Sequence, residues 1–116
     1  MTELIACLSS GKGTWAEVAH IMQAESWDAV YLVSDEFGRE KFQGKAEFVL
    51  INDNMPITMM SRIIREQLQN RIKGTEVAVN FSSGSGKEHM AMLSAVLQLG
   101  VGLRFVAMTE RGIVTL

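Results

Sequence analysis

The sequence is short of cysteine and proline, and each shortage excludes a class of protein. Its 116 residues contain one cysteine, Cys7, so no internal disulfide framework can hold the chain. Cys7 stands inside the apolar run Leu4–Leu8, which predicts a small buried hydrophobe. The single proline, Pro56, and the lack of a linker rich in Pro, Gly or Ser predict one domain over residues 1–116.

A strong charge of one sign and long hydrophobic runs are also missing. The formal net charge of -2 gives no general attraction to duplex nucleic acid. No apolar run is long enough to cross a membrane, so we expect a soluble cytoplasmic protein with no membrane partner. His20 and His89 fall in different predicted helices, without further ligands at metal-binding spacing. We therefore expect no metal and no cofactor.

What the sequence does contain is an alternation of apolar runs of strand length with helical patterns. The predicted strands cover residues 4–8, 29–33, 48–51, 77–81, 103–108 and 113–116. The first helix is expected from Thr14, with Glu17 completing a capping box, to about Ala24. The second carries an apolar stripe from Ile57 to Ile72 and is expected to stop at Gly74. The third is expected over residues 87–99, and residues 34–41 form a charged surface segment.

This alternation predicts the fold class. Buried-type strands separated by helices indicate an α/β protein with a doubly wound, Rossmann-like, mainly parallel sheet and helices on both faces. Right-handed crossovers give the strand order 3-2-1-4, with a C-terminal antiparallel hairpin beyond. The helix over residues 87–99 is apolar on more than one face, which favours burial on two sides and hence a homodimer.

Two loops repeat the pattern Ser-Ser-Gly-X-Gly between a predicted strand and a predicted helix. Glycine lets the backbone approach a ligand closely, and the first N–H groups of a helix point toward an anion. In the order 3-2-1-4 both loops lie at the carboxyl ends of neighbouring strands, where such folds bind ligands. The candidate ligand-binding residues are Ser9, Ser10, Gly11, Lys12, Gly13, Asn80, Ser82, Ser83, Gly84, Ser85, Gly86 and Lys87.

Two common phosphate-binding motifs do not fit these loops. A Walker A loop needs a glycine where Phe81 stands and a Ser or Thr where Glu88 stands. The dinucleotide fingerprint is matched only by Gly11-X-Gly13 and Ala16, with Asp35 the nearest candidate for the acidic ribose ligand. The sequence therefore favours neither magnesium-triphosphate chemistry nor a typical NAD site.

The segment Val79-Asn80-Phe81-Ser82-Ser83-Gly84-Ser85-Gly86-Lys87-Glu88-His89-Met90 resembles the signature of CARF domains, the CRISPR-associated Rossmann fold. In that family, a strand ending in Asn-hydrophobic leads into a turn like Thr-Gly-Gly-Thr-Lys and a helix carrying Met. Here the turn has one residue more before Lys87. The Ser-rich turn Leu8-Ser9-Ser10-Gly11 and the C-terminal hairpin are similar too.

The resemblance implies a homodimer that binds a cyclic oligoadenylate second messenger across both subunits, with an antiviral role. Some members of the family are ring nucleases that cleave the messenger without metal, using loop Ser and Lys residues. By that likeness Ser85 and Lys87 are the candidate catalytic residues. The chain shows no effector domain and no HEPN-type nuclease motif. If the protein senses the messenger, we therefore expect it to act alone or to signal through a partner.

Three hypotheses therefore stand. The first is a nucleotide-binding, sensor-like domain whose ligand is held by the two loops at a dimer cleft. The second is a metal-independent ring nuclease, a phosphodiesterase cleaving the same ligand. The third is a structural or interaction protein whose glycine loops serve only as tight turns, because a fold alone does not supply a function.

Overall fold

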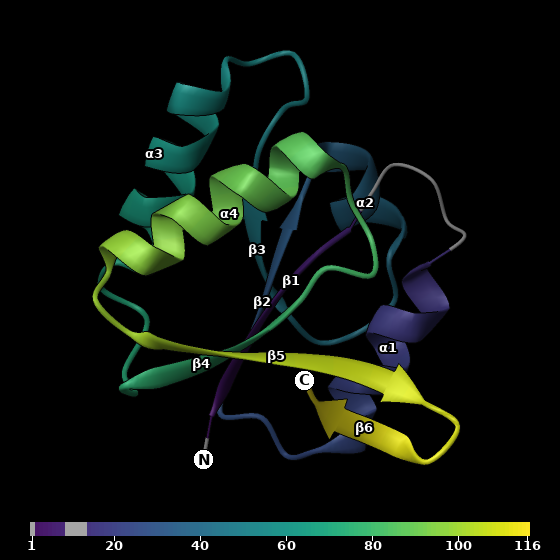
Figure 1. Cartoon of the computed structure of the whole chain (residues 1–116). Helices are drawn as coiled ribbons and strands as arrows, with labels where there is room; N and C mark the ends of the chain where they lie inside the picture. The colour runs from purple at the N-terminus through teal and green to yellow at the C-terminus, as the bar shows by residue number, and fades with distance from the viewer. Residues whose placement is uncertain (1, 9–13) are drawn as a thin grey trace.

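The computed structural model describes residues 2–8 and 14–116, and it shows an α/β protein built on one six-stranded sheet (Figure 1). The strands are β1 (Glu3–Cys7), β2 (Val30–Ser34), β3 (Glu47–Leu50), β4 (Glu76–Asn80), β5 (Gly102–Thr109) and β6 (Gly112–Thr115). They are arranged in the order β3-β2-β1-β4-β5-β6. Every neighbouring pair is parallel except β5 and β6. The α/β class and the mainly parallel sheet are confirmed.

The sheet departs from the predicted arrangement at β5. We expected an antiparallel hairpin beyond four parallel strands, but β5 itself pairs in parallel with β4, with Leu103 opposite Val77. The parallel part of the sheet is thus extended by β5, which is also the first strand of the hairpin. The physical reason is the connection through the preceding helix, a crossover that returns the chain parallel to β4.

Among the described residues, four helices flank the sheet: α1 (Trp15–Ala24), α2 (Glu36–Lys41), α3 (Ile57–Leu68) and α4 (Gly86–Gln98). The strand residues alternate between the two layers. Leu4 and Ala6 of β1 pack with residues of α1, whereas Ile5 and Cys7 pack with residues of α3 and α4. This double burial explains why β1 reads as a continuous apolar run. No helix of the described residues has the length and apolar character needed to cross a bilayer.

The helix α1 begins directly after Thr14 and ends at Ala24, as predicted, but two other predictions about helix ends are wrong. The Thr14 side chain makes no capping hydrogen bond, so the predicted capping box at the start of α1 is absent. The helix α3 ends at Leu68, well before Gly74. The backbone N–H groups of Lys73 and Gly74 donate instead to the carboxylate of Glu3, at 2.8 and 3.0 Å. Because Glu3 is buried, these bonds compensate its desolvation and turn the chain toward β4.

Candidate functional site

The carboxyl ends of β1 and β4 form the point where the chain reverses its winding. The two strands are neighbours, with Ala6 opposite Asn80, and the helices that follow them lie on opposite faces of the sheet. In doubly wound folds this is the edge at which ligands bind. The predicted adjacency of the strands before the two glycine loops is confirmed. The first-loop candidates, Ser9, Ser10, Gly11, Lys12 and Gly13, lie outside the described residues.

The second loop is braced by Asn80, the last residue of β4. Its side chain is buried, and Nδ2 donates to the carbonyl of Val106 on β5 at 2.8 Å. Its Oδ1 accepts from the backbone N–H of Ser82 at 3.1 Å. One amide side chain thus joins the loop to two strands and fixes where the loop leaves the sheet.

Gly84 brings the loop against the end of β1. Its φ of 104° lies in the left-handed region, which favours glycine. A Cβ placed on Gly84 would lie 2.8 Å from the Cβ of Cys7, closer than real Cβ contacts allow. Ser83 beside it is buried, and Ser82 is half-buried. Glycine is therefore required at position 84 by both conformation and space.

A capping box starts α4, and sequence reasoning missed it. The Ser85 hydroxyl accepts from the N–H of Glu88 at 3.2 Å, and the Glu88 carboxylate accepts from the N–H of Ser85 at 2.6 Å. The signal was readable, because Ser-X-X-Glu at a helix start is the usual pattern of this motif. The side chain of Ser85, predicted to contact a ligand or to take part in catalysis, is engaged in the helix cap.

His89 holds the loop from the other side. Its Nε2 lies 2.7 Å from the carbonyl oxygen of Ser83. Its ring stacks on Phe81, with centroids 4.7 Å apart, and Phe81 in turn meets Phe105 edge-on. The segment 81–89 is therefore a tightly connected unit, rather than an open loop with free side chains.

Lys87 is exposed at the start of α4, and its Nζ donates to the backbone carbonyl of Asp53 at 2.8 Å. This bond ties α4 to the turn that follows β3. It places the cation of the second loop beside the carboxyl end of β3, which is separated from β4 by the two strands β2 and β1 in the sheet.

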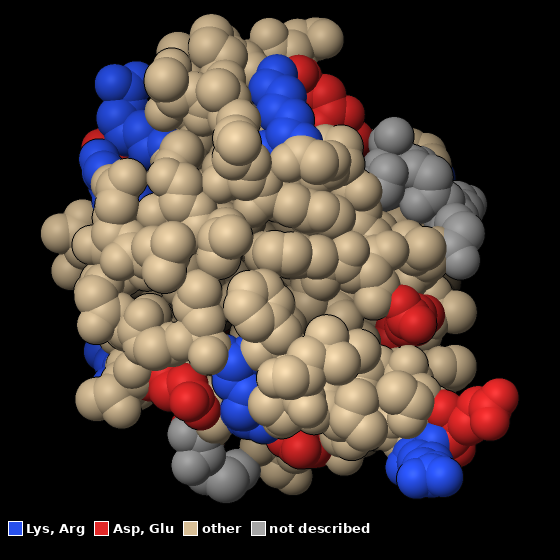
Figure 2. All heavy atoms as spheres, viewed as in Figure 1, with Lys and Arg blue, Asp and Glu red and all other residues tan. Residues whose placement is uncertain are grey.

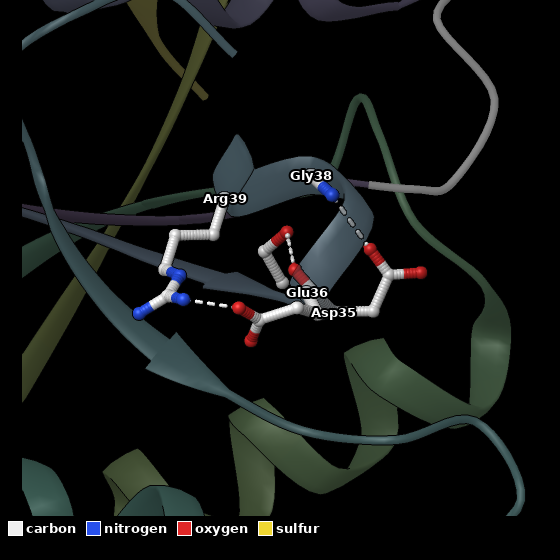
Figure 3. Close-up of polar contacts among 5 residues, drawn as sticks. Asp35, Glu36, Gly38 and Arg39 are labelled. Atoms are coloured by element: carbon white, nitrogen blue, oxygen red, sulfur yellow. Dashed lines mark hydrogen bonds and ion pairs between the residues drawn. The ribbon is translucent and has the colours of Figure 1, made fainter. Parts of the chain in front are cut away.

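A hollow of about 600 Å³ lies between that turn and the start of α2, and most of its polar lining is acidic. It is lined by Asp35, Glu36, Phe37, Leu50, Ile51, Asn52, Asp53 and Asn54. Figure 3 shows how α2 presents its acidic residues: one oxygen of Asp35 caps the helix by accepting from the N–H of Gly38 at 2.8 Å, and Glu36 pairs with Arg39. We expected only a charged surface segment here, with Asp35 as a weak ribose candidate.

The buried carboxyl group of Glu88 lies at the junction of these parts. Burial raises the pKa of Glu88, the hydrogen bond from the Ser85 N–H opposes that rise, and the nearby Asp53 carboxylate adds to it. Burial also raises the pKa of the Cys7 thiol, and the Glu88 charge adds to that effect. Cys7 is therefore an inert thiol beneath the loop, as its place in an apolar run predicts.

The site thus combines a rigid glycine loop, a helix N-terminus with one lysine, and an acidic hollow at one edge of the sheet. Comparison with known proteins adds no assignment to this geometry. No protein-family model matches the chain, and no curated protein matches its sequence.

Proposed function

We propose that this protein binds a nucleotide at the carboxyl end of its sheet, and that a cyclic oligoadenylate is the ligand to test first. The observation that carries the proposal is the unit of β4, braced loop and α4. Its glycine loop rests on the end of the neighbouring strand, at the edge where doubly wound folds bind ligands.

The phosphate is assigned to the start of α4. The first N–H groups of a helix have no intrahelical acceptor, and the helix dipole favours an anion there. Gly86 is the first residue of α4, and no atom of residues 2–8 or 14–116 lies within 4 Å of where its Cβ would stand, which favours the approach of a phosphate to its backbone. The exposed ammonium of Lys87 supplies a positive charge at the same place.

The nucleoside is assigned to the acidic hollow. Ribose hydroxyls and the adenine amino group are hydrogen-bond donors, and the carboxylates of Asp35 and Asp53 are acceptors. Phe37, which lines the hollow and is 41% exposed, offers a ring on which a base can stack. The proposed site therefore offers hydrogen-bond donors to the phosphate of one nucleotide unit and hydrogen-bond acceptors to its sugar and base. The CARF resemblance further implies a cyclic ligand of several such units, shared by two subunits.

The alternative is a ring nuclease that cleaves the same ligand without metal. It is favoured by the exposed positions of Ser85 and Lys87, two residues apart at the proposed phosphate site. Lys87 would stabilise charge that develops on the phosphate. The engagement of the Ser85 hydroxyl in the helix cap favours binding over cleavage.

Isothermal titration calorimetry with cyclic tetra- and hexa-adenylate tests the proposal. We expect saturable heat from at least one ring, and no heat at high micromolar ligand would contradict binding. Incubation of the labelled ring with the protein in EDTA, followed by chromatography, separates the two activities. Intact ring after long incubation indicates binding alone, and linear product indicates the nuclease. Absence of both leaves the loop as a structural turn.

A further inference from the structure

A cleft of about 400 Å³ lies between α3 and α4, which pack side by side on one face of the sheet (Figure 1). Its volume is within the range of small-molecule binding sites. Its polar lining consists of Thr58, Ser61, Arg62 and Arg65 of α3 and of Ser94 and Gln98 of α4. No described residue lines both this α3–α4 cleft and the acidic hollow, so the two are separate places on the molecule.

The charge in the α3–α4 cleft is positive. Arg62 and Arg65 stand three positions apart, so their side chains share one side of α3. Within residues 2–8 and 14–116, no Asp or Glu lines the cleft, and no ion pair includes either arginine. Figure 2 shows Lys or Arg side chains over α3, at the margin of a broad uncharged area. Two like charges at this spacing repel each other, and an anion held between them would remove that repulsion.

Arg65 is held in place from the opposite helix. Its Nη1 donates to Oε1 of Gln98, and Nε2 of Gln98 donates to the Ser94 hydroxyl at 3.4 Å. The bond between Arg65 and Gln98 joins α3 to α4 at the cleft. A guanidinium has five N–H donors, so this bond leaves others for a ligand. The hydroxyls of Thr58 and Ser61 add donors, and the polar lining thus suits a ligand that accepts hydrogen bonds.

The rest of the lining is apolar. Ile57 contributes from α3, and Met90 and Ala91 contribute from α4. Met90 is 66% exposed, and a methionine side chain adapts its shape to what it contacts. A neighbouring hollow of about 320 Å³ shares Met90 with the cleft and continues along α4 to Leu93 and Leu97. An inorganic anion would leave this apolar surface in water, whereas an anion with an apolar body would cover it.

We propose that the α3–α4 cleft binds a small organic anion. Its head, a carboxylate or a phosphate, pairs with Arg62 and Arg65, and its apolar body lies against Ile57 and Met90. Both kinds of head can accept two parallel hydrogen bonds from one guanidinium. A neutral ligand would gain no ion pair, and an inorganic anion would gain no apolar contact, so the lining selects a ligand that combines the two.

The positions of these residues along the helices give the orientation of the ligand. Arg65 lies in the last turn of α3 and Gln98 is the last residue of α4, whereas Ile57 is the first residue of α3. The head therefore lies toward the C-terminal ends of the two helices, and the body lies toward their N-terminal ends. The loop 82–86 takes no part in this site, so the inference is independent of nucleotide binding at the carboxyl end of the sheet.

An amide NMR titration at neutral pH with hexanoate, hexyl phosphate and the neutral control hexan-1-ol tests the proposal. We expect saturable shifts at Ser61, Arg65 and Ser94 with at least one of the two anions, and at least about tenfold weaker binding of hexan-1-ol. The anion that binds more tightly identifies the head. Acetate and inorganic phosphate, which lack the apolar body, should bind more weakly than the corresponding hexyl compound.

Arg62→Gln and Arg65→Gln should each weaken binding of the anion about tenfold or more, because each removes a charge-assisted hydrogen bond. Arg111→Gln removes the same charge from the exposed turn between β5 and β6 and should leave the Kd unchanged. Arg62 is exposed, so its variant keeps the test available if loss of the Gln98 bond unfolds the Arg65 variant. No shift with either anion, equally tight binding of hexan-1-ol or of the anions without a body, an unchanged Kd in the folded arginine variants, or shifts confined to residues 82–87 would overturn the proposal.

Discussion

Gly84, in the loop after β4, approaches Cys7 at the end of β1 so closely that a Cβ on the glycine would lie 2.8 Å from the Cβ of Cys7. Two segments 77 positions apart in the sequence thereby meet at the edge of the sheet. Through this contact the position of the loop depends on the central strand of the sheet, and the candidate site depends on the core.

Gly84→Ala should therefore destabilise the protein by about 1–3 kcal/mol, since the alanine must adopt a positive φ and displace Cys7. Gly86→Ala is the matched control, because no atom in the described part of the chain lies near the added Cβ and the residue begins α4. We expect it to be neutral or to stabilise by about 0.4–1 kcal/mol. Urea unfolding measures both, and equal effects of the two substitutions would refute the described loop conformation.

Replacing Glu88 by Gln should change how stability depends on pH. The pKa of Glu88 is raised by burial, so the folded state holds this proton more tightly than the unfolded state does. The stabilisation is complete below the unfolded pKa of about 4.3 and is lost as pH rises through the folded value. Glu88→Gln keeps an acceptor for the Ser85 N–H and removes the titration.

We thus expect Glu88→Gln to be most favourable, relative to the native chain, near neutral pH and least favourable in acid. Urea unfolding from pH 4 to pH 8 measures the difference. Glu66→Gln, an exposed change on α3, is the control. A stability difference for Glu88→Gln that stays constant over this range would contradict the assignment.

Asn80→Ala should cost about 1–3 kcal/mol of stability, because it leaves the Val106 carbonyl and the Ser82 N–H without their partner. Asn70→Ala, on the exposed turn after α3, should change stability by less than about 0.5 kcal/mol. Thermal unfolding followed by circular dichroism compares the two. A tolerated Asn80→Ala would show that the loop does not depend on this brace.

Lys87→Gln separates ligand binding from stability. Its ammonium is exposed and, among the described residues, donates to one backbone carbonyl, so the free energy of unfolding should change by less than about 0.5 kcal/mol. Loss of a charge-assisted hydrogen bond to phosphate should raise the Kd for the cyclic oligoadenylate about tenfold or more. The control Lys45→Gln precedes β3, at the opposite end of the strands, and should leave the Kd unchanged. Calorimetry that gives the same Kd for all three proteins would remove Lys87 from the site.

Much of the fold was predictable from local patterns in the sequence. Runs such as Leu4–Leu8 and Val77–Phe81 lie within one residue of β1 and β4, because strands buried on both faces need continuous apolar residues. The parallel pairing of β5 was not predictable from its own residues. The end of α3 at Leu68 was missed, and the segment after it is held through Lys73 and Gly74 by Glu3, about seventy positions away in the sequence.

The candidate site was less predictable than the fold. The pattern Ser82–Gly86 located the loop, yet the roles of its side chains depend on neighbours that only the folded chain supplies. From the sequence, Ser85 fits both a phosphate ligand and a helix cap. In the structure, its reciprocal hydrogen bonds with Glu88 show that it is the cap. The acidic hollow was not predicted, because the pairing of β2 and β3 is what brings Asp35 and Asp53 together.

The measurement that tests the central claim most directly is an amide NMR titration of the isotope-labelled protein with cyclic tetra-adenylate and cyclic hexa-adenylate. If a nucleotide binds at the carboxyl end of the sheet, the largest shifts should fall on Gly84, Gly86 and Lys87 and on the turn at Asp53. The residues at the opposite end of the strands, such as Glu76 and Gly102, should stay in place. Unchanged spectra with both rings, or shifts confined to residues outside the carboxyl edge, would contradict the account.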